Sequence, residues 1–311
     1  MISDVDLIDK ISRIVHFKES KAYYARKFGV SEQRVIDVWP QVLKLTKSPV
    51  ERHSKILLLD IETSPLITYV FQKSVWKAKI GHDRVITDWF ILTWAAKWLG
   101  DKHIFTDKLT REEALCGNDK RIIESICEML EEADVVIGHN SIDFDVPNIL
   151  TRCVSHRIPP PSPWKNIDTK RVAKSQFGFT HNSLDALGDF LNVGRKIETD
   201  FELWKRCLAG DEDALEEMRV YNEGDVVLLE NVYLVLRPFI KGHPNMDLYH
   251  NESEPVCTSC GEGSLELIPD KSFYTQAVRY DIYRCTKCGA ISRSKHGTPY
   301  SYKKKVSSIP R

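Results

Sequence analysis

Apolar positions along residues 55–240 follow two spacings, which predict strands alternating with helices. Nearly continuous apolar runs, bounded by turn residues, predict strands at 55–62, 66–72, 89–100, 102–106, 134–140 and 166–170. Apolar residues at helical spacing predict helices at 110–133 with a break near Gly117, at 145–156, and over most of 171–238. Three successive strands followed by helix–strand alternation favour an α/β fold, in which helices flank a mixed sheet.

The first part of the chain, residues 1–50, is predicted to be a separate helical region. One helix ends near Gly29, and Ser31 is placed to N-cap a second helix, whose Val35 and Val38 we expect to face inward. This pattern resembles a helix-turn-helix, in which the second helix enters the major groove of DNA. A plain helical hairpin packed on the next domain fits the same pattern, and both interpretations stay open.

Two Cys-x2-Cys pairs near the C-terminus predict a metal site. A polar, turn-rich linker, residues 241–256, separates them from the α/β domain. The ligands predicted for residues 257–311 are Cys257, Cys260, Cys285 and Cys288, and a glycine suited to a tight turn follows each pair, Gly261 and Gly289. This spacing is typical of a structural zinc site. So short a module buries little core, and zinc can contribute roughly 10–16 kcal/mol towards folding.

The segment between the two cysteine pairs, SFYTQAVRYDIYRC, is predicted to form the hairpin of a zinc ribbon. Its aromatic and basic side chains interleave, at Phe273, Tyr274, Arg279, Tyr280, Tyr283 and Arg284. Such interleaving suits stacking on bases and contact with phosphates. A purely structural or protein-binding ribbon is the alternative.

The distribution of charge adds to this picture. Lysine plus arginine and aspartate plus glutamate both number 44, so the formal net charge is +0. Basic residues are in excess at both ends, where the tail contains YKKKV, and acidic residues between them. Basic ends suggest a polyanionic partner, although ordinary solvated surfaces carry the same charges. Since no apolar run approaches a membrane span and the N-terminus is acidic, we expect a cytoplasmic protein without a membrane partner.

Two carboxylates interrupt the first apolar run, in the stretch KILLLDIETSP. Asp60 and Glu62 are two residues apart, so in a strand they point to the same face. At about 4 Å and an effective dielectric near ~20, such a like-charge pair costs on the order of 4 kcal/mol. Protonation or a divalent cation relieves this repulsion, and Mg²⁺ or Mn²⁺ prefers such oxygen ligands. A strand end with both acids solvated is the alternative.

Two further motifs place acidic residues at the edge of apolar patterns. In GHNSIDFDVPNIL, Asp143 and Asp145 follow a predicted strand and open a helix, where either can simply cap the helix. In RVYNEGDVVLLENVYLVL, Tyr221 and Asp225 are four residues apart and share a helical face. The rest of that face is predicted to be apolar, formed by Val220, Leu228, Leu229, Val232 and Leu236. A third acidic intrusion strengthens the case for a metal site.

Together these motifs resemble the DEDD superfamily of 3′→5′ exonucleases, in the tyrosine form (DEDDy), on the ribonuclease H-like fold. The resemblance covers roughly residues 55–240. DIET matches the first motif, GHNSIDFD the second and YNEGD the third. The stretches ILTWAAKWLG and NSLDALGDFL are similar to stand-alone exonucleases common in bacteriophages, which resemble the proofreading domains of family B DNA polymerases.

The resemblance implies hydrolysis of single-stranded nucleic acid from its 3′ end, with DNA favoured, releasing nucleoside 5′-monophosphates. Two Mg²⁺ or Mn²⁺ ions would be held by the four acids, Asp60, Glu62, Asp145 and Asp225. Tyr221 would orient the attacking water. Thr63 is placed to contact the terminal nucleotide through its backbone, and Asn140 and Phe144 suit strand binding and base stacking. A turn-forming asparagine and a core phenylalanine are the alternatives for the last two.

Two other functions stay open. Zinc ribbons also accompany ribonuclease H-like transposase nucleases, although those lack the Asp-x-Glu and Tyr-x3-Asp motifs. A DNA-binding adaptor on an inactive exonuclease fold is the second, although all four acids are present. The expected partners are single-stranded DNA 3′ ends and a polymerase or other replication or repair proteins. The sequence does not separate DNA from RNA, because that choice depends on how a site treats the 2′-hydroxyl.

Overall fold

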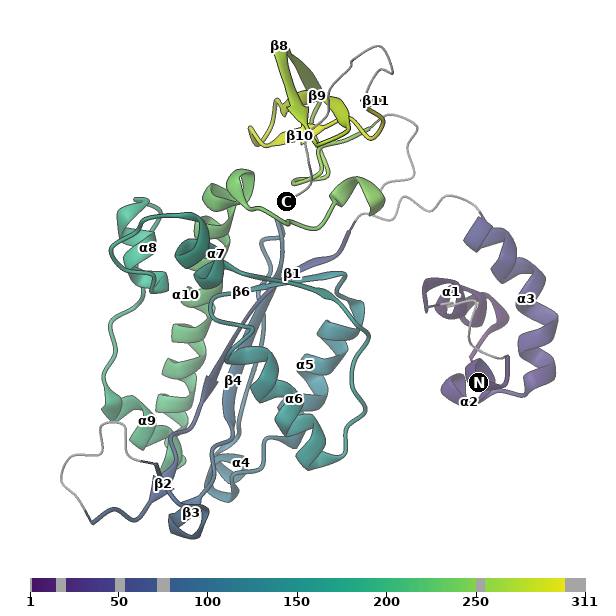
Figure 1. The fold of residues 1–311 in the computed structure, drawn as a ribbon. Coiled ribbons are helices and arrows are strands. Elements are labelled where there is room, and N and C mark those ends of the chain that lie inside the picture. Colours follow the sequence, from purple (N-terminus) through teal and green to yellow (C-terminus); the bar gives the residue numbers. More distant parts are fainter. Residues whose placement is uncertain (1, 15–20, 48–53, 72–78, 250–254, 300–311) are drawn as a thin grey trace. The chain divides into compact units, whose positions relative to one another are not determined.

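The structure is a computed structural model that describes residues 2–14, 21–47, 54–71, 79–249 and 255–299 (Figure 1). The chain divides into two compact units, residues 1–53 with 248–255 and residues 54–247 with 256–311, and each is described by itself. The predicted basic tail YKKKV lies outside the described residues. Within the described ranges, no helix has the length and apolar character needed to cross a membrane.

The first unit contains helices α1 (Asp4–Ile14), α2 (Lys21–Phe28) and α3 (Glu32–Lys47). They share an apolar core that includes Leu7, Ile11, Tyr24, Val35 and Val38. The burial of the two valines confirms the inward face predicted for α3. The hydroxyl of Ser31 accepts a hydrogen bond from the backbone of Arg34 at 3.3 Å, which is the predicted N-cap.

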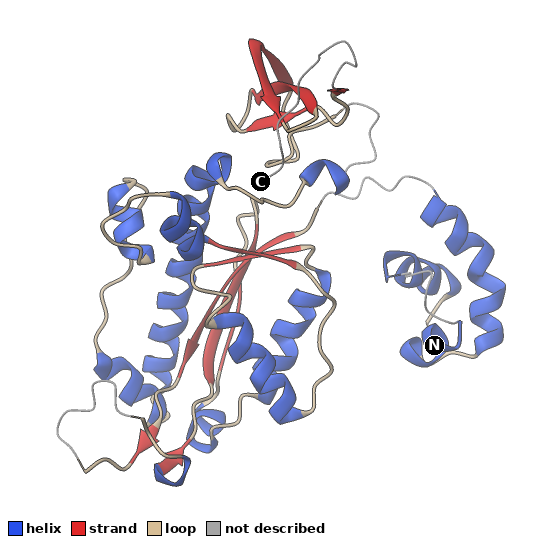
Figure 2. Ribbon diagram, in the orientation of Figure 1, coloured by secondary structure: helices blue, strands red, loops and turns tan. Residues whose placement is uncertain are grey.

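A five-stranded mixed sheet forms the centre of the second unit (Figure 2). Its strand order is β5-β4-β1-β6-β7. The strands are β1 (Ile56–Thr63), β4 (Ile91–Trp98), β5 (Phe105–Lys108), β6 (Val135–Gly138) and β7 (Lys165–Asp168). β4 pairs antiparallel with β1 and β5, whereas β6 pairs parallel with β1 and β7. The predicted α/β fold with a mixed sheet is therefore confirmed.

Helices cover both faces of this sheet (Figure 1). They are α4 (Arg111–Cys116), α5 (Lys120–Glu132), α6 (Asp145–His156), α7 (Thr169–Gln176), α8 (Leu184–Phe190), α9 (Phe201–Leu208) and α10 (Glu212–Leu236). α5 and α6 lie on one face, and the long α10 lies on the other, against β4 and β1. Short 3-10 turns occur at η1 (His82–Arg84), η2 (Arg237–Phe239) and η3 (Met246–Tyr249).

Alternation along β1 explains how this layered core positions two acids. Leu57, Leu59 and Ile61 belong to the core cluster that includes the buried face of α5. Asp60 and Glu62 therefore point to the opposite face, towards α10. On that same side, Lys97 of β4 and Glu230 of α10 form a buried ion pair that ties helix to sheet.

Three sequence predictions about elements have definite outcomes. The break near Gly117 is confirmed, because α4 ends there with a left-handed glycine (φ 64°) before α5 begins. The strand predicted at 66–72 is wrong in extent over its described part, 66–71, where only β2 (Ile67–Thr68) forms and pairs with β3 (Val85–Thr87) outside the main sheet. Its apolar side chains are not buried by any described residue, and Phe71 is 92% exposed. Val220 is also misassigned, because it is 44% exposed and lies off the buried stripe of α10.

The cysteine module contains a β-hairpin, as predicted. Its strands are β8 (Leu265–Tyr274), β9 (Val278–Cys285), β10 (Ile291–Arg293) and β11 (Thr298–Pro299). β8 and β9 form the antiparallel hairpin, and β10 and β11 pair with β9. This small sheet buries few apolar side chains, and its core cluster consists of Cys257, Cys285 and Ala290.

Candidate active site

The parallel strands β1, β6 and β7 have their carboxyl ends on the same side of the sheet. Ligand sites in α/β folds form beyond the carboxyl ends of such strands. β6 pairs with β1 only as far as Leu58, so the part of β1 that carries Asp60 and Glu62 has a free edge on that side. A bulge between Glu62 and Thr63 then bends the strand. The loop after β6 carries Asn140 at the same edge.

Three of the four predicted metal-binding acids meet on the α10 side of this edge. One oxygen from each of Asp60, Glu62 and Asp225 lies within 4.8 Å of the others. The amide of Asn222 donates a hydrogen bond to Asp60 Oδ2 at 2.6 Å. Asp225 is 1% exposed, and its Oδ1 accepts no hydrogen bond from the described residues. A buried carboxylate oxygen without a partner, in an all-oxygen donor set, fits a hard divalent cation.

The fourth acid, Asp145, lies beside this group rather than in it. It is the first residue of α6, it is buried, and its Oδ1 accepts a hydrogen bond from the backbone of Ile61 at 3.1 Å. Its charge still raises the pKa of Asp60 and of Glu62. Asp143 is exposed and pairs with Arg171 at 2.6 Å. Neither aspartate caps α6, whose N-cap position is Phe144 without a side-chain hydrogen bond.

Burial and crowding raise the pKa of every acid in this site. Loss of water raises the pKa of Glu62 to about 8 and that of Asp145 to about 7. For Asp60, burial and then the charges of Asp145 and Asp225 hold the pKa well above its usual range. Burial also raises the pKa of Asp225. Such a cluster keeps protons unless a cation neutralises it.

Lys196 supplies a positive charge inside this acidic cluster. Its ammonium nitrogen lies 2.5 Å from Asp225 Oδ2 and donates a hydrogen bond to the hydroxyl of Tyr221 at 3.0 Å. Its loop packs closely on α10 at Gly224, where a Cβ would lie 3.1 Å from the side chain of Ile197. Burial raises the pKa of the surrounding carboxylates, and the positive charge of Lys196 offsets part of that rise.

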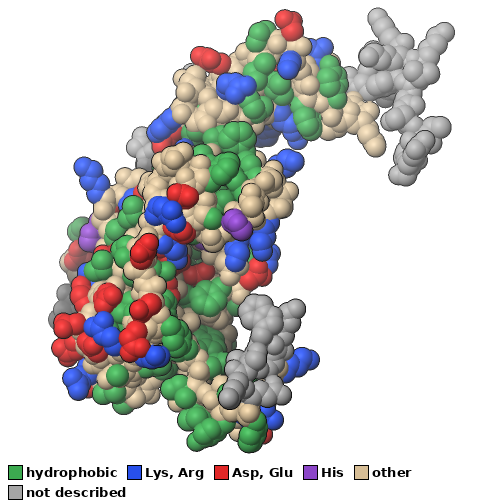
Figure 3. All heavy atoms as spheres, turned by 90° about the vertical axis from the view of Figure 1, so that its left-hand side faces the viewer, with side chains coloured by type: hydrophobic (Ala, Val, Ile, Leu, Met, Phe, Trp, Pro, Cys, Tyr) green, Lys and Arg blue, Asp and Glu red, His purple; other side chains and the backbone are tan. Residues whose placement is uncertain are grey.

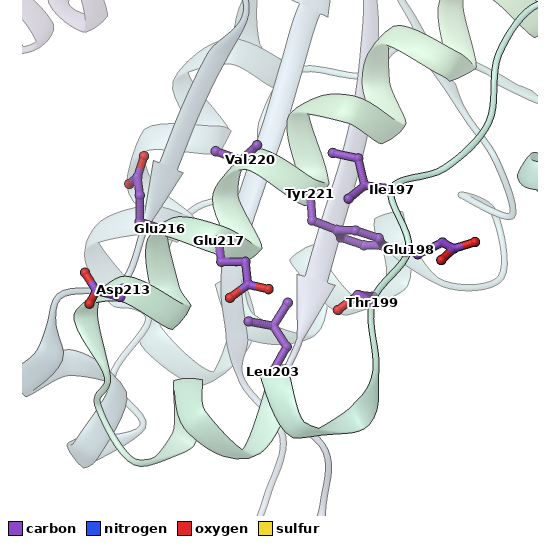
Figure 4. A pocket seen from close by; sticks show the side chains of 9 residues that line it. All are labelled: Ile197, Glu198, Thr199, Leu203, Asp213, Glu216, Glu217, Val220 and Tyr221. Atoms are coloured by element: carbon purple, nitrogen blue, oxygen red, sulfur yellow. The ribbon is translucent and has the colours of Figure 1, made fainter.

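Tyr221 and Thr63 are joined through Trp204. The Trp204 ring packs edge-on to Tyr221, with centroids 6.2 Å apart, and its indole N–H donates to the carbonyl of Thr63 at 3.2 Å. Tyr221 lines one cavity of about 330 Å³, and Thr63 lines a second cavity of the same volume. Thr199 lines both cavities. Figure 4 shows Tyr221 extending from α10 towards the segment 197–199. None of the four acids lines either cavity, and the cavities are linked to the acidic cluster through Tyr221, whose hydroxyl binds Lys196, and Thr63, which follows Glu62 in β1.

Asn140 and Phe144 lie in the turn between β6 and α6. Asn140 adopts a left-handed backbone (φ 77°), and its N–H donates to Asp168 Oδ1 at 3.0 Å. The other carboxylate oxygen of Asp168 accepts from the backbone of Ile142 at 3.2 Å. Phe144 is 38% exposed, so its ring is not a core side chain. Asn140 thus has the turn-forming backbone considered as one alternative.

Sequence reasoning missed several residues of this site. Asn222 stands inside the motif YNEGD, and a polar residue one turn from Asp225 on a buried face was an available signal. Lys196 and Trp204 carried no such signal, because one lies in an irregular loop and the other contacts Thr63 across 141 positions of sequence. Asp168, in the stretch NIDTK at the end of a predicted strand, gave a signal only for a strand-end or capping residue. It does N-cap α7, and it also holds the Asn140 turn.

The four cysteines of the C-terminal module form a second cluster. Their sulfur atoms all lie within 4.8 Å of one another, with Cys257 to Cys288 and Cys260 to Cys285 both at 3.7 Å. Ligands about 2.3 Å from a tetrahedral zinc ion are about 3.8 Å apart, so the spacing fits. The glycines after each pair, Gly261 (φ 69°) and Gly289 (φ 78°), adopt the left-handed turns that were predicted.

Comparison with known proteins agrees with the fold. Residues 57–237 match the model of the RNase H superfamily. No curated protein matches the chain. One similar solved structure is the family B DNA polymerase from the hyperthermophilic archaeon Pyrobaculum calidifontis, at 18% identity and a TM-score of 0.44, covering 60% of this chain and 25% of the polymerase. The chain therefore corresponds to only a quarter of that polymerase. Since the family match spans more than half of the 311 residues, the chain belongs to the RNase H superfamily.

Proposed function

We propose that the protein is a metal-dependent 3′→5′ exonuclease of the DEDDy type that degrades single-stranded nucleic acid, with DNA favoured, and releases nucleoside 5′-monophosphates. Membership of the RNase H superfamily supports nuclease chemistry in general. The observation that carries the finer proposal is the group formed by Asp60, Glu62 and Asp225, with Asp145 and Tyr221 beside it.

The four acids would hold two Mg²⁺ or Mn²⁺ ions, Asp60, Glu62 and Asp225 directly and Asp145 after its side chain turns from the backbone of Ile61. Bound divalent ions supply charge stabilisation and an activated water for phosphodiester hydrolysis. Asn222 fixes one oxygen of Asp60, leaving the other free to face the cluster. Tyr221 presents its hydroxyl beside Asp225, where it can orient the attacking water.

The cavity beside Thr63 is proposed to hold the 3′-terminal nucleotide. Its lining combines three residues with hydroxyl groups and one carboxylate, Asp200, with the rings of Phe201 and Trp204. Its volume of about 330 Å³ falls in the range of small-molecule sites. Asn140 and Phe144 are proposed to contact the preceding part of the strand, since the Phe144 ring is partly exposed.

The remaining parts of the chain are assigned supporting roles. The C-terminal cysteines are proposed to bind one structural Zn²⁺ in a zinc ribbon, residues 257–311. The helical region, residues 1–50, is proposed to bind DNA as a helix-turn-helix. Residues 55–240 form the exonuclease domain in this proposal, and residues 241–256 the linker. A polymerase or another replication or repair protein is the proposed partner.

The test is hydrolysis of 3′- and 5′-labelled single-stranded DNA and RNA, with and without Mg²⁺ or Mn²⁺. Wild type is expected to shorten the 5′-labelled strand stepwise from its 3′ end, only with a metal ion. Asp60→Ala is expected to be inactive because it removes a shared metal ligand. The matched control is Asp101→Ala, an exposed aspartate in the β4–β5 turn at the opposite edge of the sheet.

Each other outcome identifies a rival. Activity that survives in Asp60→Ala contradicts the site. Nicking of circular DNA favours a transposase-like endonuclease. Clean wild type that binds single strands but hydrolyses none with either metal favours an inactive DNA-binding adaptor.

A further inference from the structure

Four phenylalanines form a ladder on the same side of the sheet as α10. Phe177 lies between Phe179 and Phe239, with ring centroids 5.2 Å and 6.0 Å away. Phe179 in turn contacts Phe190 at 5.2 Å. The end members are 68% (Phe190) and 64% (Phe239) exposed. Single exposed apolar side chains are common on protein surfaces, whereas a contiguous group of them marks an interaction site.

The ladder is continuous with the candidate active site through α7. Asp168 N-caps this helix with the same carboxylate that holds the Asn140 turn. His139, next to Asn140, connects this turn with both ends of the segment 169–182. Its ring nitrogens lie 2.9 Å from Thr169 Oγ1 and 3.0 Å from the carbonyl oxygen of Asn182. At the far end of α7, the side chain of Gln176 accepts a hydrogen bond from the backbone of Lys241 at 2.8 Å.

The charge along this path suits a polyanion. The segment TKRVAKSQFGFTH, residues 169–181, lies in the acidic part of the chain but contains no acidic residue. Its cations are Lys170, Lys174 and Arg171, of which Arg171 is paired with Asp143. Lys170 and Lys174 are four apart, so they share one face of α7. The acids nearest the Phe190 end, Asp185 and Asp189, are both paired with Arg195, at 2.9 Å and 3.2 Å. Figure 3 shows the molecule from this side, where hydrophobic side chains lie among both basic and acidic ones.

We propose that α7 and this ladder form a track for single-stranded nucleic acid, along which the substrate leads away from the active site. Lys170 and Lys174 bind phosphates, and bases stack on the phenylalanines. Every base has a stacking face, so the track takes any sequence. A protein partner would find the same rings, but the cations of α7 favour a nucleic acid. The inference rests on the proposed function for its direction, because the 3′ end must lie in the active site.

Equilibrium binding tests the track separately from catalysis. Fluorescence anisotropy of 5′-labelled oligothymidylates of about 4 and about 16 nucleotides, in EDTA, measures affinity without hydrolysis. Phe190→Ala/Phe239→Ala is expected to bind the long strand at least about tenfold more weakly and the short strand as wild type does. Leu115→Ala/Val154→Ala, which removes two exposed apolar side chains from α4 and α6, is expected to change neither affinity.

Two further binding measurements show which side chains contact bases and which contact phosphates. Wild type should bind a long strand with an abasic 5′ half as weakly as the phenylalanine variant binds an intact one. Lys170→Gln/Lys174→Gln should reduce the slope of log affinity against log salt by about 1.4, since each single-strand phosphate contributes about 0.7. Long-strand binding unchanged in the phenylalanine variant, or equal loss for both lengths, overturns the track. Wild type that binds strands length-dependently yet cuts none refutes the proposed function while leaving the track standing.

Discussion

The ammonium nitrogen of Lys196 lies 2.5 Å from Asp225 Oδ2 and 3.0 Å from the hydroxyl of Tyr221. It therefore links the two residues of the third motif that the sequence placed on one helical face. A cation at this position lowers the repulsion among the carboxylates, whose pKa values burial has raised. It also fixes the Tyr221 hydroxyl beside the acidic cluster.

Replacement of this lysine should change the pH dependence of hydrolysis. In Lys196→Met the carboxylates lose a positive charge that lowers their pKa, so they keep protons to higher pH. We expect the acid limb of the kcat/KM profile with Mg²⁺ to move up by at least about half a pH unit, which corresponds to about 0.7 kcal/mol. Lys205→Met, on the exposed face of α9, is the control. An acid limb that does not move would show that Lys196 leaves the charge state of the site unaffected.

Stability without metal should fall as pH rises. Glu62 has a pKa of about 8 in the folded protein and an ordinary value of 4.5, and Asp145 has about 7 against 3.8. The folded state thus binds more protons than the unfolded state between about pH 4 and 8, and stability declines across this window. We expect Tm in EDTA to decrease from pH 5 to pH 8.5, and excess Mg²⁺ to reverse the decrease at the upper end, because the ion binds only the folded site.

Asp60→Asn tests whether this trend comes from the cluster. The variant removes the carboxylate of Asp60, whose pKa burial and then the charges of Asp145 and Asp225 hold well above its usual range, so its Tm in EDTA should depend less on pH. A wild-type Tm that rises between pH 5 and 8.5 in EDTA contradicts the raised pKa values.

Asn222 should act through the position of Asp60. In Asn222→Leu the 2.6 Å hydrogen bond to Asp60 Oδ2 is lost. We expect hydrolysis to fall at least about tenfold, by about 1.4 kcal/mol of transition-state stabilisation. The free energy of unfolding should change by less than about 1 kcal/mol, because an unpartnered buried Asn222 Oδ1 is removed at the same time. Normal activity at every Mg²⁺ concentration would show that Asp60 needs no such support.

The sequence predicted those features of the structure that follow from the periodicity of a strand or a helix. Alternation in β1 predicted that Asp60 and Glu62 share a face, and the four-residue spacing predicted the same for Tyr221 and Asp225. The strand at 66–72 failed because an apolar run forms a long strand only where a core covers it, and Phe71 has none. Lys196 reaches the cluster through contacts between an irregular loop and α10, and the phenylalanine ladder forms between rings of separate segments. No local spacing encodes either arrangement.

The cysteine cluster should bind one zinc ion and hold the C-terminal module together. Metal analysis of purified wild type is expected to give one Zn²⁺ per chain, and Cys257→Ser should lose it, because a Cys₄ site tolerates few ligand changes. Hydrogen exchange in β8 and β9 should then speed up while exchange in β1 and β4 stays slow, since the module has little core of its own. Cys116→Ser, an exposed cysteine on α4, is the control. Full zinc content in Cys257→Ser would exclude this site.

The buried ion pair of Lys97 and Glu230 should make a large contribution to the free energy of unfolding. Their side chains are 9% and 11% exposed, and Glu230 also accepts a hydrogen bond from the backbone of Gly100 at 2.9 Å. Lys97→Met leaves a buried carboxylate without its partner, so we expect the free energy of unfolding in urea to fall by about 3–5 kcal/mol. Lys97→Met/Glu230→Gln removes both charges yet keeps an acceptor for Gly100, and should recover most of that loss.

An exposed pair provides the comparison for this last measurement. Lys205 and Glu202 lie 2.8 Å apart on α9, and their side chains are 58% and 59% exposed. Lys205→Met should therefore change the free energy of unfolding far less than Lys97→Met does. If Lys97→Met costs no more than Lys205→Met, α10 is not anchored to β4 through a desolvated charge pair. If the double variant is no more stable than Lys97→Met, the loss comes from packing of the lysine stem rather than from an unpaired carboxylate.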